Sequence, residues 1–283
     1  MSIEKEASAF DPERDPSPMQ SLVAEDGVVR RKWPDLETRY ARLLEYTFAK
    51  AREESRLANI VVVGAMDGRR FDALYPYLSK GLARAILIEP IPDRFALLQE
   101  TFADQSTLIF ENCAIDAQRG TREMLYVPID AVERQGLSED VIGMSSFYDD
   151  RNGLGRGDEA VEAHIERAEV RTCPLSDIVR QHGFDAIDIL QTDTEGHDLH
   201  VLKSLDMSVV RPDTIFMEYY NMPQSERLEL VHLFESQGYI YGNARKDICA
   251  TLHRLPPKHE SRIATRLRRL KRSVTKRLRR LTG

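Results

Sequence analysis

Short apolar runs alternate with amphipathic helical segments over most of the chain, and this rhythm constrains the fold more than any other feature of the sequence. The apolar runs have the length of strands and lie at residues 59–63, 85–89, 107–111, 187–192 and 214–218. Apolar residues at helical spacing mark 70–79, 93–102, 175–182, 198–205 and 225–237. Alternation at this scale predicts an α/β fold, in which right-handed crossovers build a mostly parallel sheet with helices on both faces.

The predicted domain occupies residues 58–255, and one long segment interrupts it. Strand-like pieces at 123–127 and 168–173 enclose a stretch rich in Gly, Asp and Arg, so residues 128–168 are expected to form a lid-like insertion. An insertion of this length in a compact domain is usually functional or mobile. Near the end of the domain, 239–241 and 248–253 flank a turn-rich stretch and predict a terminal hairpin.

The two ends of the chain differ in composition from its body. Residues 1–28 are rich in Asp, Glu, Pro and Ser and predict a disordered leader. Residues 29–57 predict an N-terminal helical extension that packs on the domain edge. In residues 256–283, apolar side chains recur three and four positions apart between Lys and Arg, which predicts a basic amphipathic helix.

Charge and cysteine content narrow the location and the partners. The formal net charge is −6, although the tail is strongly basic, so the body is acidic. This profile disfavours nucleic acid as a partner, and the tail at 262–281 has two candidate partners, an anionic membrane surface and the acidic body itself. No apolar run is long enough to span a membrane, and the first residues do not predict a secretory signal. We expect a cytoplasmic protein, with peripheral association at the inner membrane face left open, and structural thiols at Cys113, Cys173 and Cys249.

A glycine turn follows the first apolar run. Residues 64–68 read Gly-Ala-Met-Asp-Gly, and glycines at such a turn let the backbone approach a ligand closely. The nicotinamide fingerprint requires glycine where Met66 and Arg69 stand, and no Gly-Lys-Ser/Thr follows as in a P-loop. A nicotinamide oxidoreductase is therefore disfavoured, while a plain strand-to-helix turn remains an alternative.

Acids stand at the ends of later runs. Glu89 ends the second run, 25 residues after Gly64, where Rossmann-like folds bind a pair of ribose hydroxyls. At the end of the third run, Asn112 offers polar groups that suit an adenine edge. Asp193 and Glu195 follow the fourth run, two positions apart. Ligands of open α/β sheets collect at the carboxyl ends of the strands, so this pair predicts chemistry.

Six stretches occur in a diagnostic order: Val-Gly-Ala-Met-Asp-Gly (63–68), Ile-Glu-Pro-Ile-Pro (88–92), Glu-Asn-Cys-Ala-Ile (111–115), Gly-Met-Ser-Ser-Phe (143–147), Leu-Gln-Thr-Asp-Thr-Glu-Gly-His-Asp (190–198) and Phe-Met-Glu-Tyr (216–219). In this order the chain resembles the FkbM family of S-adenosylmethionine-dependent methyltransferases over residues 59–253. The resemblance implies a class I methyltransferase fold, which is Rossmann-like, with a mostly parallel seven-stranded sheet and a terminal antiparallel hairpin.

The resemblance also implies site residues. Those expected to bind S-adenosyl-L-methionine are Gly64, Ala65, Asp67, Gly68, Glu89, Asn112, Ala114 and Asp193. Those expected on the acceptor side are Ser145, Ser146, Glu218, Tyr219 and Tyr220. The residues themselves suggest that the loop at 143–158, which includes Ser145, Ser146, Arg151 and Arg156, is a lid, with a solvated loop as the alternative. The sequence departs from the common family turn at Met66, where Asn or Phe is usual, and at Asp67, where Ile or Asn is often found.

Methyl transfer to an alcohol requires alignment of the two reactants and removal of a proton. We expect Asp193 to be the base and Glu195 to orient the acceptor or Asp193, since both would lie beneath the reacting methyl. Chelation of a divalent metal by the same pair stays open, but no third ligand is evident, so no metal residues are predicted. His197 and Asp198 are interpreted as the opening of a helix, where an acid favours the positive dipole end.

The leading hypothesis is a methyltransferase that O-methylates a hydroxyl of a small polar or glycosidic acceptor, and the resemblance alone implies this acceptor class. The alternative is a non-catalytic cofactor-binding or scaffold protein that the basic tail recruits to a membrane.

Overall fold

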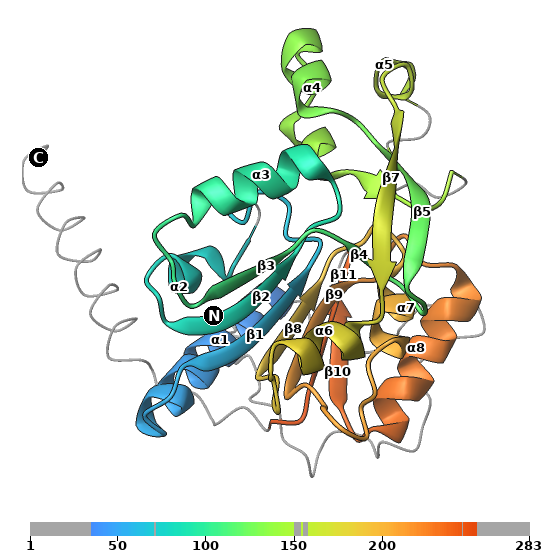
Figure 1. Ribbon diagram of the computed structural model, residues 1–283. Coiled ribbons are helices and arrows are strands. Elements are labelled where there is room, and N and C mark those ends of the chain that lie inside the picture. Colours follow the sequence, from blue (N-terminus) through green and yellow to red (C-terminus); the bar gives the residue numbers. More distant parts are fainter. Residues whose placement is uncertain (1–34, 71, 150–153, 155–157, 245, 254–283) are drawn as a thin grey trace, which may run out of the picture. The chain divides into compact units, whose positions relative to one another are not determined.

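Two β-sheets and their helices form the part of the chain that the computed structural model describes, residues 35–70, 72–149, 154, 158–244 and 246–253 (Figure 1). All of these residues belong to one compact unit. The leader predicted at 1–28 and the basic helix predicted at 256–283 lie outside the described residues. Among the helices of the described ranges, none combines the length and the apolar character needed to cross a bilayer.

The larger sheet has seven strands in the order β10-β11-β9-β8-β1-β2-β3. Their bounds are β1 Ala58–Val63, β2 Ala83–Ile88, β3 Leu108–Glu111, β8 Ile189–Thr192, β9 Thr214–Glu218, β10 Ile240–Ala244 and β11 Asp247–Thr251. All neighbours are parallel except β11, which runs antiparallel to both β9 and β10. The predicted seven-stranded sheet with its terminal hairpin is confirmed. β11, the last strand that the structure describes along the sequence, lies between β9 and β10.

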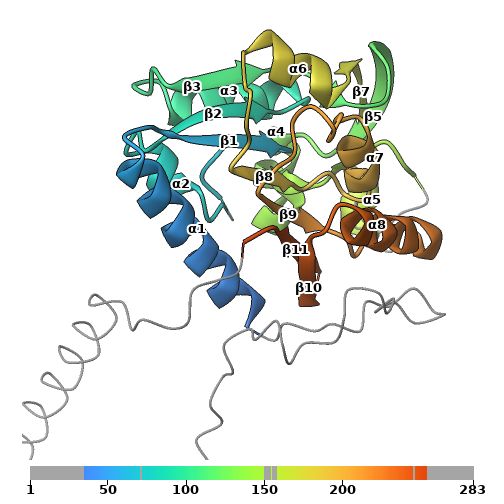
Figure 2. The same cartoon turned by 90° about the horizontal axis from the view of Figure 1, so that it is seen from below.

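Helices cover both faces of this sheet, which is why its central strands are continuous apolar runs. α1 (Leu36–Glu53), α2 (Tyr75–Leu78) and α3 (Pro92–Thr101) lie on one side, and α6 (Leu175–Gln181), α7 (Asp198–Lys203) and α8 (Gln224–Ser236) on the other (Figure 1). α1 runs beside the sheet (Figure 2), where Tyr40 stacks on Phe216 with ring centroids 4.0 Å apart. The Tyr40 hydroxyl donates to Gln191 of β8.

The helix predicted at 70–79 is much shorter than expected. Among the residues of this range that the structure describes, a turn follows the glycines and only α2 is helical. Asp67 Oδ1 accepts from the backbone N–H groups of Arg69 and Arg70, and Asp72 Oδ1 accepts from that of Leu74. Asp side chains that bond nearby backbone compete with the helical pattern, so the helix starts late. No helix N-terminus therefore opens directly at the glycine turn.

The segment that interrupts the sequence rhythm builds the second sheet, whose order is β4-β7-β5-β6. Its strands are β4 Ala114–Ile115, β5 Gly120–Tyr126, β6 Ser145–Ser146 and β7 Glu166–Cys173, and its helices are α4 Ile129–Gln135, the 3₁₀ helix η1 Glu139–Gly143 and α5 Glu159–Glu162. Arg94 of α3, which is 1% exposed, joins this segment to the main domain. Its guanidinium donates to the carbonyl oxygens of Met144, Val127 and Gly143.

Candidate active site

The carboxyl ends of β1 and β8 meet at the centre of the larger sheet. Val63 and Thr192 are paired, so Gly64 and Asp193 leave their strands side by side. Gly64 has φ +80°, and a Cβ atom there would lie 2.0 Å from the Asp193 carbonyl oxygen. Only glycine combines this backbone conformation with so close a contact. The two most informative motifs of the sequence are thus in direct backbone contact.

Glu89 holds the glycine turn from the end of β2. One carboxylate oxygen accepts from the backbone N–H of Met66 and the other from that of Ile91, both at 2.9 Å. Met66 has φ +49°, a conformation that is costly for a residue with a side chain and that persists where surrounding contacts enforce it. Burial raises the pKa of Glu89, and the nearby Arg94 opposes the rise.

A cavity opens beside this turn, with about 360 Å³ of empty space out to its open mouth. Four residues predicted from the sequence line it, Gly64, Ala114, Ser145 and Asp193. Its other lining residues were not predicted as site residues: Val63, Pro90, Cys113, Ile115, Met124, Phe147, Thr194 and His197. The predicted cofactor and acceptor sides therefore share one cavity.

Other predicted cofactor residues support the walls and do not line the cavity. The Asn112 amide donates to the carbonyl oxygens of Glu89 and Pro90, which ties the end of β3 to the end of β2. The Asp67 carboxylate caps its own turn and pairs with Arg70. Gly68 is needed for packing, because a Cβ atom there would lie 2.3 Å from Cε2 of Phe102. Ala65 is buried and donates its N–H to Ile88.

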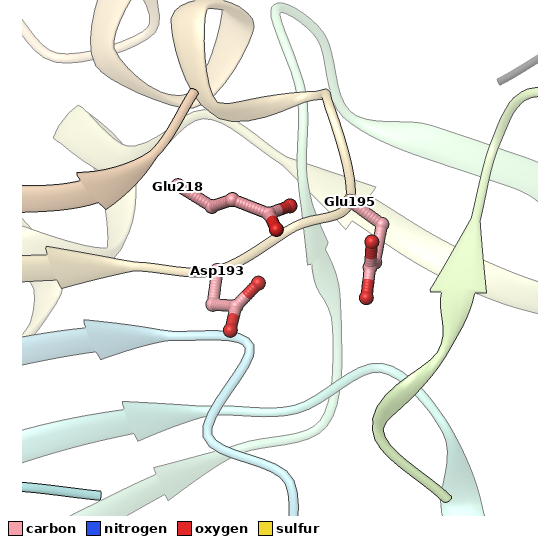
Figure 3. A group of neighbouring side chains, drawn as sticks. All are labelled: Asp193, Glu195 and Glu218. Atoms are coloured by element: carbon pink, nitrogen blue, oxygen red, sulfur yellow. The ribbon is translucent and has the colours of Figure 1, made fainter. Parts of the chain in front are cut away.

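Three carboxylates converge at the ends of β8 and β9. Asp193, Glu195 and Glu218 point toward a common centre (Figure 3), and each offers an oxygen within 4.8 Å of the others. The Asn221 amide donates to Glu195 at 2.6 Å and to Glu218 at 2.9 Å, so one neutral side chain bridges two acids. Glu195 has φ +51°, a second strained residue at the site.

The crowding of these acids changes their protonation. Asp193 is exposed toward the cavity, and the protein around it still desolvates its carboxylate. This desolvation, followed by the charges of Glu218 and Asp198, raises the pKa of Asp193 well above its ordinary value. Burial and the charge of Asp193 do the same for Glu195, and burial raises the pKa of Glu218 to about 7. Like charges in one enclosed site disfavour full ionisation, so the cluster suits a cation.

A divalent metal ion is one cation that such a cluster could accept. Mg²⁺ and Ca²⁺ prefer oxygen ligands, and carboxylates are the usual protein donors. The sequence offered only Asp193 and Glu195 as a metal-binding pair and assigned Glu218 to the acceptor side, so Glu218 as a third ligand was not predicted. The signal for Glu218 was its place at the end of the strand next to β8, which becomes visible only when the strand order is known.

His197 lies in the cavity wall, a role that the sequence analysis missed. It is 3% exposed, its Nδ1 is 2.7 Å from the Tyr148 hydroxyl, and its Nε2 is 3.6 Å from Asp116. The Phe147 ring meets it edge-on. Asp198 does open α7, as predicted, and accepts a hydrogen bond from Thr192. The prediction that His197 and Asp198 open a helix is therefore correct for Asp198, but it did not include the position of His197 in the cavity wall.

The acceptor-side residues predicted from the sequence divide into two groups. Ser146 is fully buried and its Oγ donates to the Glu195 carbonyl oxygen at 3.4 Å, next to Ser145 in the cavity wall. Tyr219 belongs to the hydrophobic core, its hydroxyl accepts from Asn243, and it is not among the residues that line the cavity. Tyr220 is 48% exposed, beside Lys246. Arg151 and Arg156 lie outside the described residues.

Comparisons with known proteins agree with these motifs. A family model described as the methyltransferase FkbM domain matches residues 63–241. Among solved structures, the methyltransferase FkbM from Methylobacillus flagellatus KT is 16% identical, with 69% of this chain and 43% of that chain covered and a TM-score of 0.43. This chain thus spans less than half the length of that protein.

Two further solved structures are more distant in sequence. The N-terminal domain of human METTL16 in complex with SAH is 11% identical, with 82% of this chain and 77% of that chain covered and a TM-score of 0.39. An O-methyltransferase from Bacillus cereus in complex with SAH is 9% identical, with coverages of 76% and 80% and a TM-score of 0.37. No curated protein matches the sequence.

Proposed function

This chain belongs to the FkbM family of methyltransferases, whose methyl donor is S-adenosylmethionine, and from that premise we propose that it methylates a hydroxyl group of a small polar or glycosidic acceptor. The observation that carries the proposal is the contact between Gly64 and Asp193. Gly64 of the glycine turn and Asp193 of the acidic cluster line the same cavity.

The residues at the cavity fit this donor. When bound, S-adenosylmethionine supplies an electrophilic methyl group on a positively charged sulfur. Gly64 presents bare backbone to the cavity, and the neighbouring carboxylates offset a positive charge. We place the methionine end against Gly64 and Asp193 and the adenine against Ala114. Glu89 already accepts two backbone N–H groups, and its carboxylate keeps lone pairs for the ribose hydroxyls.

Asp193 is the proposed base for the acceptor hydroxyl. It lines the cavity, and its raised pKa makes its ionised form a stronger proton acceptor than an ordinary carboxylate. Glu195 and Glu218 both accept a hydrogen bond from the amide of Asn221, and we propose that their negative charges help to keep Asp193 basic. We propose that Ser145 and Glu218 bind the polar face of the acceptor, with His197 and Tyr148 in the adjoining wall.

Calorimetry and an acceptor screen test this function. S-adenosylmethionine and S-adenosylhomocysteine should bind, reduced nicotinamide cofactor should not, and methyl transfer should appear on sugar or alcohol hydroxyls. Binding without transfer to any acceptor would instead favour a non-catalytic scaffold. Asp193→Asn should bind S-adenosylhomocysteine normally and lose at least about 100-fold in kcat, the range of general base catalysis. Asp185→Asn, at an exposed position, is the control, and full activity of Asp193→Asn would remove the base assignment.

A divalent cation is the second candidate occupant of the acidic cluster, favoured by the convergence of the three carboxylates. If it is required, a chelator should abolish methyl transfer, and Mg²⁺ or Mn²⁺ should restore it. If the chelator does not affect methyl transfer, no metal is required, and the carboxylates act directly on the donor and the acceptor.

The basic segment at 262–281 lies outside the described residues, and its membrane role is proposed from the sequence. Apolar residues at helical spacing between Lys and Arg suit an anionic bilayer surface. The full chain should bind vesicles that contain anionic lipid and not neutral vesicles, and truncation before residue 256 should abolish the binding. Equal binding to both vesicle types would count against the anchor.

A further inference from the structure

Two cysteines that stand 60 residues apart in the sequence are neighbours in the structure. Cys113 directly precedes β4, and Cys173 ends β7. β4 and β7 are parallel neighbours in which Ile115 is paired with Cys173. Side chains alternate along an extended chain, so Cys113 shares the face of Ile115 and therefore of Cys173. The two sulfur atoms are 3.3 Å apart, and both side chains are buried.

The surroundings make the two thiols chemically unequal. The hydrogen bond with the Cys113 thiol lowers the pKa of Cys173, and Arg171 and Arg119 add to this effect against the opposing effect of burial. The same hydrogen bond and burial raise the pKa of Cys113. The thiolate is the form that attacks an oxidant. Either sulfur can make the first attack, and the other, 3.3 Å away, is placed to make the second.

We propose that Cys113 and Cys173 form a reversible disulfide bond on exposure to a hydroperoxide, which makes the pair an oxidative modification site beside the cavity. One of the two sulfurs attacks the O–O bond and keeps one oxygen as a sulfenic acid, while the other oxygen leaves as water or an alcohol. The second sulfur then displaces that hydroxyl, which leaves with the proton of the second thiol as water. Two thiols are oxidised and one hydroperoxide is reduced.

A disulfide bond is about 2.05 Å long, so the sulfur atoms must approach each other by little more than about 1 Å. The third cysteine is placed differently. Cys249 lies in β11, in the other half of the larger sheet, and burial raises the pKa of its thiol to about 12. It serves as an internal control for the specificity of oxidation.

The bond would act on the cavity through residues already described. Cys113 lines the cavity beside Ala114, and its other neighbour, Asn112, is hydrogen-bonded to the end of β2. Movement of Cys113 toward β7 therefore shifts the wall on the proposed adenine side. This consequence rests on the proposed function, whereas formation of the bond does not. We expect the oxidised protein to bind S-adenosylhomocysteine about 10-fold more weakly than the reduced protein, a difference of about 1.4 kcal/mol in binding free energy.

Peptide mapping of the full chain tests the bond directly. After treatment with hydrogen peroxide, blocking of free thiols and digestion with trypsin, the three cysteines fall in separate peptides, 95–119, 172–180 and 247–254. We expect the first two to be joined, with a mass lower by two hydrogen atoms and full release by dithiothreitol. Three free thiols after treatment, a link to the Cys249 peptide, or irreversible oxidation alone would overturn the proposal.

Variants and calorimetry complete the test. Cys249→Ala should retain the link, and Cys113→Ala and Cys173→Ala should each abolish it. The mapping of the unaltered chain stands even if a variant does not fold. Loss of S-adenosylhomocysteine affinity on oxidation should reverse with dithiothreitol and should be absent in Cys113→Ala. If the reduced protein fails to bind S-adenosylhomocysteine at all, the proposed function fails, while the disulfide is still judged by the mapping.

Discussion

The carbonyl oxygen of Asp193 lies 2.0 Å from the place that a Cβ atom would occupy on Gly64. This contact joins the end of β1 to the end of β8 across the paired residues Val63 and Thr192. It explains why a glycine stands at the first position of the turn and why the acid that follows β8 enters the cavity at that point. The turn and the acidic cluster therefore form one structural unit.

Replacement of Gly64 by Ala should damage both the fold and the binding of the cofactor. The new methyl group would collide with backbone and would also hold φ near +80°. We expect a loss of at least about 2 kcal/mol in the free energy of unfolding, from backbone strain and overpacking. Gly238→Ala is the matched control, since Gly238 has φ +76° with nothing within 4 Å of the new Cβ. Urea denaturation should separate the two, and equal losses would refute the role of the Asp193 contact.

Asn221→Leu should separate the binding of S-adenosylmethionine from that of S-adenosylhomocysteine. Without the shared amide, Glu195 and Glu218 lose a hydrogen bond to their ionised forms, so their pKa values rise and the cluster is less negative at pH 7. We expect the affinity for S-adenosylmethionine, which carries the cationic sulfonium, to fall about 3- to 10-fold. A roughly 10-fold loss equals the free energy of a pKa shift of about one unit. The affinity for S-adenosylhomocysteine, whose sulfur is neutral, should change little. Asn112→Leu, which removes hydrogen bonds to carbonyl oxygens only, should weaken both ligands alike. Calorimetry measures each, and parallel losses in Asn221→Leu would contradict this explanation.

The acidic cluster should make the protein without ligand more stable at mildly acid pH. Burial raises the pKa of Glu218 to about 7 in the folded state, and Asp193 and Glu195 are also raised. The folded state then holds protons that the unfolded state releases, so the free energy of unfolding falls as pH rises from about 5 to about 7.5. We expect Glu218→Gln to flatten this dependence by about 1–2 kcal/mol. Thermal unfolding at both pH values checks it, and identical slopes in the two proteins would rule the cluster out as the cause.

Arg94→Met should loosen the inserted sheet. The variant loses donors to Met144, Val127 and Gly143 and leaves the buried Glu89 without its neighbouring cation. We expect a loss of about 2–4 kcal/mol in the free energy of unfolding, as for other buried charged groups.

The control for this prediction is Arg134→Met. Arg134 pairs with Asp130 on an exposed helix surface, with side chains 70% and 69% exposed, and such pairs contribute less than about 0.5 kcal/mol. Denaturation curves that lose the same stability in both variants would show that Arg94 is not a structural anchor.

The sequence by itself determined the succession of strands and helices and the residues that end each strand. These features depend on local periodicity and on short motifs, which is why β1, β8 and β9 lie where the apolar runs predicted them and why Gly64, Glu89 and Asp193 were found. One helix boundary was predicted wrongly. The side chains of Asp67 and Asp72 accept hydrogen bonds from nearby backbone N–H groups, so the helix predicted at 70–79 is shorter in the structure.

Only the tertiary structure decided which of these residues meet. Glu218 joins Asp193 because β9 is the neighbour of β8, and Cys173 meets Cys113 because β7 pairs with β4. His197 faces the cavity, whereas Tyr219 turns into the core. Strand order and register depend on packing between segments that are far apart in the chain. Local sequence patterns therefore do not determine them. The acidic cluster and the thiol pair are therefore properties of the folded sheets.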